Sequence, residues 1–219
     1  MTLSYEEART FYDRFGSKQD GQRFYEDRAI ADLIAHASFE KAGSVLEFGC
    51  GTGQLAETLL ARHLPPSSRY LALDISTTMV SLARKRLTHF GDRVDVRRTS
   101  GEMQLPANSG TCDRFLSTYV LDLLSDDDIR LLIKEAHRVL SSGGFLAISS
   151  LTHGSKFVPR LIENAWVLFY SIRPRWVGGC RPISLLSYID DSEWRIFHRA
   201  EIVQCGVTSE IVIAERKTT

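Results

Sequence analysis

Short apolar runs alternate along the chain with stretches in which apolar residues recur at helical spacing. The runs predict strands at Ser44–Phe48, Tyr70–Leu73, Arg93–Arg98, Arg114–Thr118 and Phe145–Ser150. Two later runs, roughly Ala200–Val203 and Glu210–Ala214, are close enough to pair as a hairpin around Gly206. Strands that alternate with helices imply right-handed crossovers and a sheet covered on both faces. We therefore expect an α/β fold with a seven-stranded, mostly parallel sheet and a C-terminal antiparallel hairpin.

The helices between these strands have recognisable ends. Gln54–His63 precedes two prolines that stop it, and a second helix is capped by Ser76 and ends at Gly91. Ser125 caps a third helix, because it is followed by three aspartates that suit the positive first turn. This helix is expected to end at Gly143–Gly144. Its apolar face is formed by Ile129, Leu132, Ile133, Ala136 and Leu140.

The composition fits one globular domain and disfavours several functional classes. The chain has 219 residues, of which 43% are hydrophobic and 25% charged, enough for one substantial core. Basic and acidic residues number 27 each, so no net field favours nucleic acid or an anionic membrane. The sequence has no run long enough for a membrane span and no signal-peptide core. We therefore expect a cytoplasmic protein without a nucleic-acid partner.

Cysteine and histidine give no evidence of a metal centre. The four cysteines are scattered and form neither a CxxC pair nor a cluster with histidine: Cys50, Cys112, Cys180 and Cys205. Four of the six histidines have no partner that the sequence reveals: His36, His63, His89 and His198. We expect no metal, and reduced thiols agree with a cytoplasmic location.

A glycine-rich turn follows the first strand, where ligands bind in sheets of this kind. Val45–Gly53 carries glycines at alternate positions, so the backbone can turn sharply and approach a ligand. The helix that begins near Gln54 directs free amides and a positive dipole at that ligand. Asp74 closes the second strand, where a carboxylate can accept the hydroxyls of an adenosine ribose. The turn therefore predicts a site for an adenosine-containing ligand.

Two residues argue against a dinucleotide at this site. The third glycine of a G-x-G-x-x-G motif would fall at Gln54. Glu47 precedes the turn, and its carboxylate would repel a pyrophosphate but favour an ammonium group.

Three segments, in this order, resemble motifs of the class I S-adenosylmethionine-dependent methyltransferases. VLEFGCGTG (Val45–Gly53) resembles their first motif, and DISTTM (Asp74–Met79) resembles D-x-S-x-x-M. Glu135–Gly144 resembles the E-x-x-R-V-L-K-P-G-G segment before the fifth strand. The likeness covers about residues 43–150, and Thr10–Phe15 is similar to the leader of the ubiquinone/menaquinone-biosynthesis (type 11) enzymes. The resemblance implies a Rossmann-like fold and S-adenosyl-L-methionine as cofactor.

The resemblance also implies roles for individual residues. Asp74 would hold the ribose and Ile75 would pack on the adenine. Gly101 stands where the family has an acid that binds the adenine amino group, so Glu102 or a backbone group would take that contact. Tyr12, with Tyr5 as an alternative, would bond the cofactor carboxylate from the leader, unless the leader aromatics only pack on the core. The other cofactor positions implied are Glu47, Gly49, Cys50, Gly51, Gly53, Met79 and Ser117.

Candidate acceptor residues follow the fourth and fifth strands. Tyr119 and Asp122 lie at the carboxyl end of the fourth strand, where either could contact or deprotonate the acceptor. Asp122 could instead interact with the start of the following helix. His153, after the fifth strand, is a third candidate base or a surface-loop histidine.

Residues 152–195 resemble no family motif and are predicted to roof the acceptor pocket. They are rich in aromatic residues and arginines: Phe157, Trp166, Phe169, Tyr170, Trp176, Arg160, Arg173, Arg175 and Arg181. This composition suits an apolar or aromatic small molecule with an anionic or polar end. Helical spacing of the aromatics is equally typical of ordinary core, and Arg173–Trp176 leaves peripheral membrane contact open.

We interpret residues 1–219 as one domain: a helical lid (1–40), a cofactor-binding core (41–151), the acceptor insert (152–195) and the terminal hairpin (196–219). The expected activity is methyl transfer to a small-molecule acceptor on oxygen, carbon or nitrogen, by a monomer or homodimer. Two alternatives stay open. One is an inactive S-adenosylmethionine-binding module that acts through a partner; the other is a different adenosyl-nucleotide enzyme on this fold, such as an NAD oxidoreductase or an aminopropyltransferase.

Overall fold

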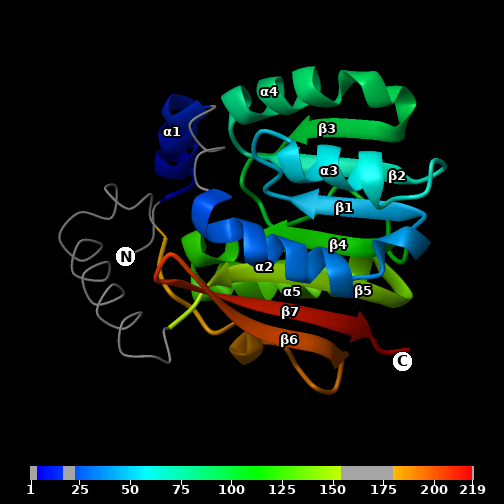
Figure 1. The fold of residues 1–219 in the computed structure, drawn as a ribbon, viewed down its shortest axis with the longest axis vertical. Helices are drawn as coiled ribbons and strands as arrows, with labels where there is room; N and C mark the ends of the chain where they lie inside the picture. Colours follow the sequence, from blue (N-terminus) through cyan, green and yellow to red (C-terminus); the bar gives the residue numbers. More distant parts are fainter. Residues whose placement is uncertain (1–3, 17–22, 154–179, 219) are drawn as a thin grey trace.

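The computed structural model describes residues 4–16, 23–153 and 180–218 (Figure 1). Their seven strands form one sheet in the order β3-β2-β1-β4-β5-β7-β6. The first five strands along the chain are parallel, and β7 is antiparallel to both β5 and β6. The bounds are β1 (Ser44–Phe48), β2 (Arg69–Asp74), β3 (Val94–Arg98), β4 (Cys112–Thr118), β5 (Leu140–Leu151), β6 (Trp194–Gln204) and β7 (Val207–Arg216). The expected sheet and its terminal hairpin are confirmed.

Helices cover both faces of the sheet (Figure 1). α2 (Arg23–His36), α3 (Gln54–Arg62) and α4 (Thr77–Leu87) pack on one face, and α5 (Asp126–Val139) packs on the other. α1 (Tyr5–Phe15) contacts α4 at the end of the sheet where the parallel strands finish. None of the described helices is long and apolar enough to cross a membrane.

The position of β7 between β5 and β6 follows from the polarity of the two hairpin strands. Thr208–Ala214 in β7 is buried without interruption, so both of its faces are covered. β6 alternates between exposed and half-buried positions, which is typical of an edge strand. The turn residues Cys205 and Gly206 both have positive φ, at 52° and 81°, as a two-residue hairpin turn with the sheet's twist requires.

One predicted helix end was wrong. α5 ends at Val139 rather than at Gly143–Gly144, because Leu140 already pairs with Cys112 as the first residue of β5. The other helix stops at Gly91 as predicted: α4 ends at Leu87, the first 3-10 turn of η3 (Thr88–Arg93) continues it to Phe90, and Gly91 has a non-helical backbone with a φ of +56°.

Most of the predicted acceptor insert, residues 154–179, lies outside the described residues. This holds for Phe157, Arg160, Trp166, Phe169, Tyr170, Arg173, Arg175 and Trp176. The described end of the insert contains η6 (Leu185–Tyr188), and Trp194 already belongs to β6.

Candidate functional site

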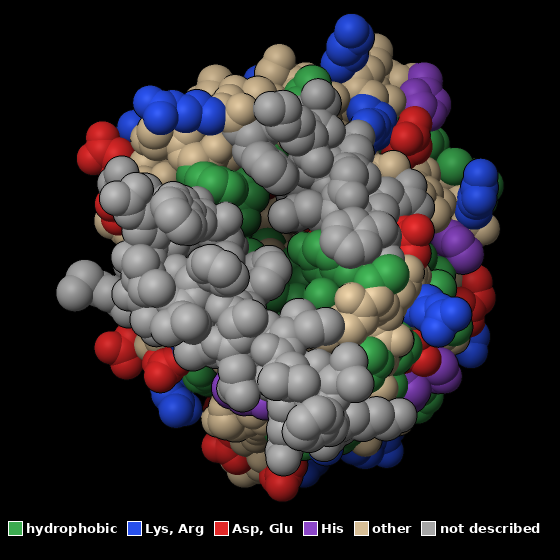
Figure 2. Space-filling model, turned by 60° about the vertical axis from the view of Figure 1, so that its left-hand side comes forward, with side chains coloured by type: hydrophobic (Ala, Val, Ile, Leu, Met, Phe, Trp, Pro, Cys, Tyr) green, Lys and Arg blue, Asp and Glu red, His purple; other side chains and the backbone are tan. Residues whose placement is uncertain are grey.

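The candidate site lies at the carboxyl ends of β1 and β4, where the strand order reverses and ligands of such sheets bind. Figure 2 shows hydrophobic side chains around a hollow on this side of the molecule. Two adjoining cavities open here, with empty volumes of about 850 and 1340 Å³. We call them the first and the second cavity. Tyr12, Gly49, Thr118 and Tyr119 line both, so the two cavities form one continuous site.

The glycine turn connects β1 to α3 and is bonded to β2. The amides of Gly49 and Cys50 both donate to the carbonyl of Leu73, at 2.8 and 2.9 Å. Gly49 has a φ of +83°, and a Cβ on it would lie only 2.2 Å from Cγ2 of Val120 in the loop after β4. Gly49 is therefore required by packing within the protein as well as by the turn.

Asp74 joins the turn to the first cavity. Its carboxylate accepts hydrogen bonds from the amides of Gly51 and Ser76, both at 2.8 Å. Burial raises the pKa of Asp74 to about 6, although these two hydrogen bonds stabilise the carboxylate and act to lower the pKa. The same carboxylate lines the first cavity together with Ile75 and Gly101, the residues implied to surround the adenosine.

Glu47 lines the second cavity behind the turn. Its side chain is buried, and the Tyr70 hydroxyl donates to Oε2 at 2.9 Å. Burial raises the pKa of Glu47 to about 7. A cation in this cavity would restore the charged form of Glu47, as expected for a partner of an ammonium group.

Asp122 is the most unusual group of the site. It lies in η4 (Leu121–Leu123) after β4, is fully buried and lines the second cavity. Neither carboxylate oxygen has a partner of normal hydrogen-bond geometry among the described residues, although the Cys180 thiol is close enough to lower the pKa slightly. Burial dominates and raises the pKa of Asp122 to about 7, helped by the negative charge of Glu26. A buried carboxyl whose oxygens can still accept hydrogen bonds can bind a polar ligand or take up a proton.

Three tyrosines line the site: Tyr12 and Tyr119 line both cavities, and Tyr25 lines the second. Tyr25 and Tyr119 meet edge to face, with ring centroids 5.9 Å apart. Tyr119 adopts a φ of +53°, rare for an aromatic residue, and its hydroxyl bonds Ser209 at 2.8 Å. Burial raises the pKa of Tyr12, Tyr25 and Tyr119 above the usual phenol value, so all three stay neutral near pH 7.

Six predicted site residues do not line either cavity. Ser117 donates to the Phe48 carbonyl, and Gly53 packs on Ala83. Met79 is fully buried in the core, while Glu102 and His153 are exposed. Gly51 reaches the first cavity only through its bond to Asp74. The Arg181 guanidinium, expected near the acceptor, instead pairs with Asp126 at 2.7 Å.

Glu26, Cys180 and Asp128 are among the lining residues that sequence reasoning missed. Glu26 lies on α2 and Cys180 precedes η6, and both reach the second cavity beside Asp122. Asp128 lines the first cavity, where it accepts a 2.6 Å hydrogen bond from Tyr5. The only sequence signal was the acidic first turn of α5, which explains Asp128 equally well as a helix cap.

The lining chemistry fits S-adenosylmethionine better than a pyrophosphate. Asp74, Glu47, Asp122 and Glu26 contribute carboxylates, and no lysine or arginine lines either cavity among the described residues. A sulfonium and an ammonium group would be attracted by this set, whereas a pyrophosphate would be repelled.

The middle of the chain matches a known family. Residues 45–144 match the model of a methyltransferase domain, over the glycine turn, Asp74 and the β4 loop. The chain belongs to the class I S-adenosylmethionine-dependent methyltransferases. The family implies S-adenosylmethionine as the methyl donor, and the predicted type 11 subgroup stays a prediction.

Similar proteins agree with this assignment. A malonyl-[acyl-carrier protein] O-methyltransferase of Marinomonas sp. (strain MWYL1) is 31% identical over 156 residues, 71% of this chain and 54% of that protein. A trans-aconitate 2-methyltransferase of Azoarcus sp. (strain BH72) is 30% identical over 121 residues, which are 55% of this chain and 44% of that protein. The chain thus spans about half the length of these curated relatives. A putative methyltransferase in complex with the Haloferax volcanii Trm112 activator has the same fold, with a TM-score of 0.75 and 16% sequence identity. The match covers 97% of this chain and 98% of that one.

Proposed function

We propose that the protein transfers the methyl group of S-adenosylmethionine to a small-molecule acceptor. The observation that carries this proposal is the continuous site at the glycine turn, which is lined by carboxylates and neutral tyrosines. S-adenosylmethionine supplies an already activated methyl group on a sulfonium, so the protein has to align the acceptor and exclude water.

The two cavities divide the cofactor between them. In this proposal the first cavity holds the adenosine, with Ile75 and Gly101 at the base and Asp74 at the ribose. Glu47 in the second cavity faces the ammonium group of the methionine end. Tyr12 lines both cavities, which suits a residue that closes over the sulfonium between them.

Asp122 is proposed as the general base that acts on the acceptor. Its carboxyl is buried and has a pKa near 7, so it can accept a proton from a hydroxyl or an ammonium group near neutral pH. Tyr119 stays protonated and bonded to Ser209, which suits positioning rather than proton transfer.

The acidic second cavity favours an acceptor that is neutral or cationic where it meets Asp122. The two curated relatives are named for malonyl and trans-aconitate acceptors, both of which are carboxylic acids. A carboxylate beside Asp122 and Glu26 would be repelled. We therefore expect this chain to prefer an amine or a hydroxyl compound over a carboxylic acid.

Binding calorimetry tests the cofactor assignment. S-adenosylmethionine and S-adenosylhomocysteine should both bind, and NAD should not. Tight binding of NAD with no binding of either sulfur nucleoside would overturn the proposal. A screen of metabolite pools for S-adenosylhomocysteine release then tests turnover. Cofactor binding without release by any pool would favour the inactive binding module.

Replacing Asp74 by Ala should weaken S-adenosylmethionine binding by about 1–3 kcal/mol, because two ribose hydroxyls lose their acceptor. Asp74→Asn keeps the shape of the side chain and should show a smaller loss. Asp95→Asn on β3 is the matched control, since Asp95 is half-exposed and outside both cavities. Equal affinities of the wild type and Asp74→Ala would place the ribose elsewhere.

A further inference from the structure

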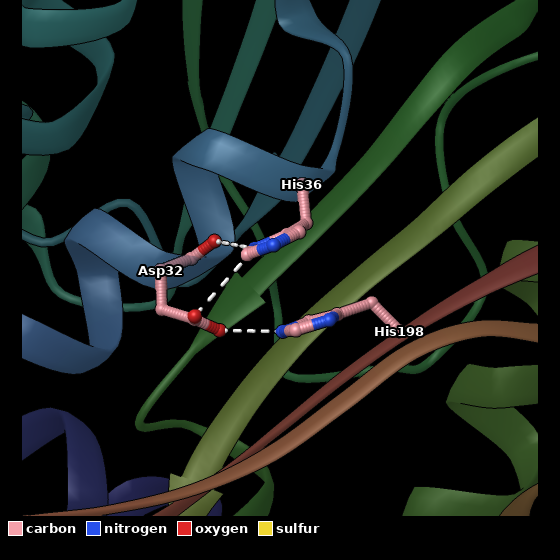
Figure 3. Close-up of side chains that lie close together, drawn as sticks. All are labelled: Asp32, His36 and His198. Carbon is pink, nitrogen blue, oxygen red and sulfur yellow. Dashed lines mark hydrogen bonds and ion pairs between the residues drawn. The ribbon is translucent and has the colours of Figure 1, made fainter.

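Asp32, His36 and His198 form a cluster outside the proposed methyl-transfer site. Asp32 and His36 lie one turn apart on α2, and His198 comes from β6. Nε2 of His198 is 2.7 Å from Oδ2 of Asp32. Nδ1 of His36 donates to the backbone carbonyl of Asp32 at 2.8 Å and lies 3.5 Å from Oδ1 of its carboxylate, which leaves Nε2 as the nitrogen that His36 would offer a metal. Figure 3 shows both imidazole rings beside this one carboxylate.

A β-bulge directs His198 toward α2. Ile196 pairs with Ala214 and His198 with Ile213, so one extra residue of β6 stands between consecutive residues of β7. Ile196 accordingly packs on the α5 side of the sheet, whereas Ala200 and Ile202 pack on the α2 side. Bulges commonly re-aim a side chain in this way. The three side chains therefore meet because of a specific irregularity in an edge strand.

The cluster has the chemistry of a transition-metal site. Each residue offers one ligand atom, and these atoms lie within 4.8 Å of one another. Two imidazoles and a carboxylate form a ligand set that Zn²⁺ accepts, with a remaining position for water. The side chains are 21%, 42% and 21% exposed for Asp32, His36 and His198, so an ion can enter and the rings can turn.

The two imidazole rings of the cluster are also in direct contact. The rings stack in parallel, with centroids 3.6 Å apart and an interplanar angle of 6°. An imidazole nitrogen binds a metal in the plane of its ring, so one ion shared by both rings requires the rings to turn out of this stacked arrangement.

We propose that Asp32, His36 and His198 bind one Zn²⁺ or a similar divalent transition-metal ion, in addition to the methyl-transfer function. Ligands around Zn²⁺ are about 3.3 Å apart, so rotations of the side chains that unstack the two rings would complete the site. The ion would pin α2 to β6. α2 also carries Tyr25, Glu26 and Ile30, which line the second cavity, so the ion would stabilise that wall of the pocket.

Chelator-treated full-length protein titrated with Zn²⁺ tests this proposal. We expect one ion per chain and a rise in Tm of about 5–10 °C when free Zn²⁺ is about a hundredfold above Kd. With Co²⁺ as the probe, the visible absorption of a four- or five-coordinate ion should appear. None of these readouts requires the acceptor or the cofactor, so failure here is distinct from failure of the proposed function.

Variants of the cluster separate metal binding from simple packing. His198→Gln removes a ligand, and Asp32→Asn removes the anionic ligand while keeping a hydrogen-bond partner for His198. Each should weaken Zn²⁺ binding at least about tenfold and abolish the Co²⁺ band. His89→Gln is the matched control, because His89 lies in η3 beside β3, at the opposite edge of the sheet. No Zn²⁺-dependent rise in wild-type Tm, or equal Zn²⁺ affinity in the wild type and Asp32→Asn, would overturn the proposal.

Discussion

Asp122→Asn is expected to make the unliganded protein more stable at pH 8 and nearly inactive. Burial holds the pKa of Asp122 at about 7, against 3.8 for an exposed aspartate. At about 1.36 kcal/mol per unit, the ionised carboxylate costs the fold up to about 4 kcal/mol above pH 7. Asparagine removes the charge but stays polar, so we expect a gain of about 2 kcal/mol, or about 4–8 °C in Tm.

The pH dependence of this gain identifies its cause. Because the pKa is raised in the folded state, the contribution of Asp122 to stability is fully present below pH 4 and lost as the pH rises through about 7. The difference in Tm between Asp122→Asn and the wild type should therefore grow from pH 4 to 7 and then level off. Glu47 and Asp74 titrate in both proteins and cancel from this difference.

Activity should change in the opposite direction. With an acceptor from the metabolite screen, Asp122→Asn should lose about 10²–10⁴-fold in kcat, and wild-type kcat/KM should rise with pH through about 7. Asp92→Asn is the control, because Asp92 is an exposed carboxylate remote from the site and should change stability by less than about 0.5 kcal/mol. A destabilised but fully active Asp122→Asn would show that Asp122 is a structural group.

Gly49→Ala is expected to disrupt the site by destabilising the turn. The new Cβ would lie 2.2 Å from Val120, and the residue would keep a φ of +83° that alanine disfavours. Backbone strain of about 1–2 kcal/mol and overpacking of about 1–3 kcal/mol predict a loss of about 3–4 kcal/mol, or about 10 °C in Tm. S-adenosylmethionine binding should fall below detection in calorimetry, because the turn holds Asp74 through Gly51.

Two further variants separate the backbone strain at Gly49 from the clash with Val120. Gly91→Ala has a φ of +56° and no atom within 4 Å of its Cβ, so it measures the backbone cost alone, about 1–2 kcal/mol. Gly49→Ala combined with Val120→Ala relieves the clash and should recover part of the stability lost in the single variant. Equal stabilities of Gly49→Ala and Gly91→Ala would show that the contact with Val120 costs nothing.

Local signals in the sequence were sufficient for the fold and for half of the site. The alternation of strands and helices predicted the sheet, and the turn with Asp74 predicted the first cavity. Both depend on residues close together in the chain, whose spacing sets which side chains share a face. The end of α5 was missed because Leu140 fits the apolar face of the helix as well as the strand. The pairing of Leu140 with Cys112 decides that Leu140 belongs to the strand. The spacing of apolar residues along the chain contains no information about which strands pair.

The sequence by itself determined the glycine turn, the acidic end of β2 and the family, since a turn of this kind needs its residues at fixed local positions. The tertiary structure alone decided which carboxylates share a cavity. Asp122, Glu26 and Cys180 come from η4, α2 and the segment before η6, and packing removes Asp122 from water without giving its carboxylate a hydrogen-bond donor of normal geometry among the described residues. Likewise, the bulge in β6 brings His198 to Asp32 and His36. Desolvation and proximity across the chain arise only on folding, so Glu26, Cys180 and the three residues of the histidine cluster have no sequence signature, whereas Asp122 was predicted from its place after the fourth strand.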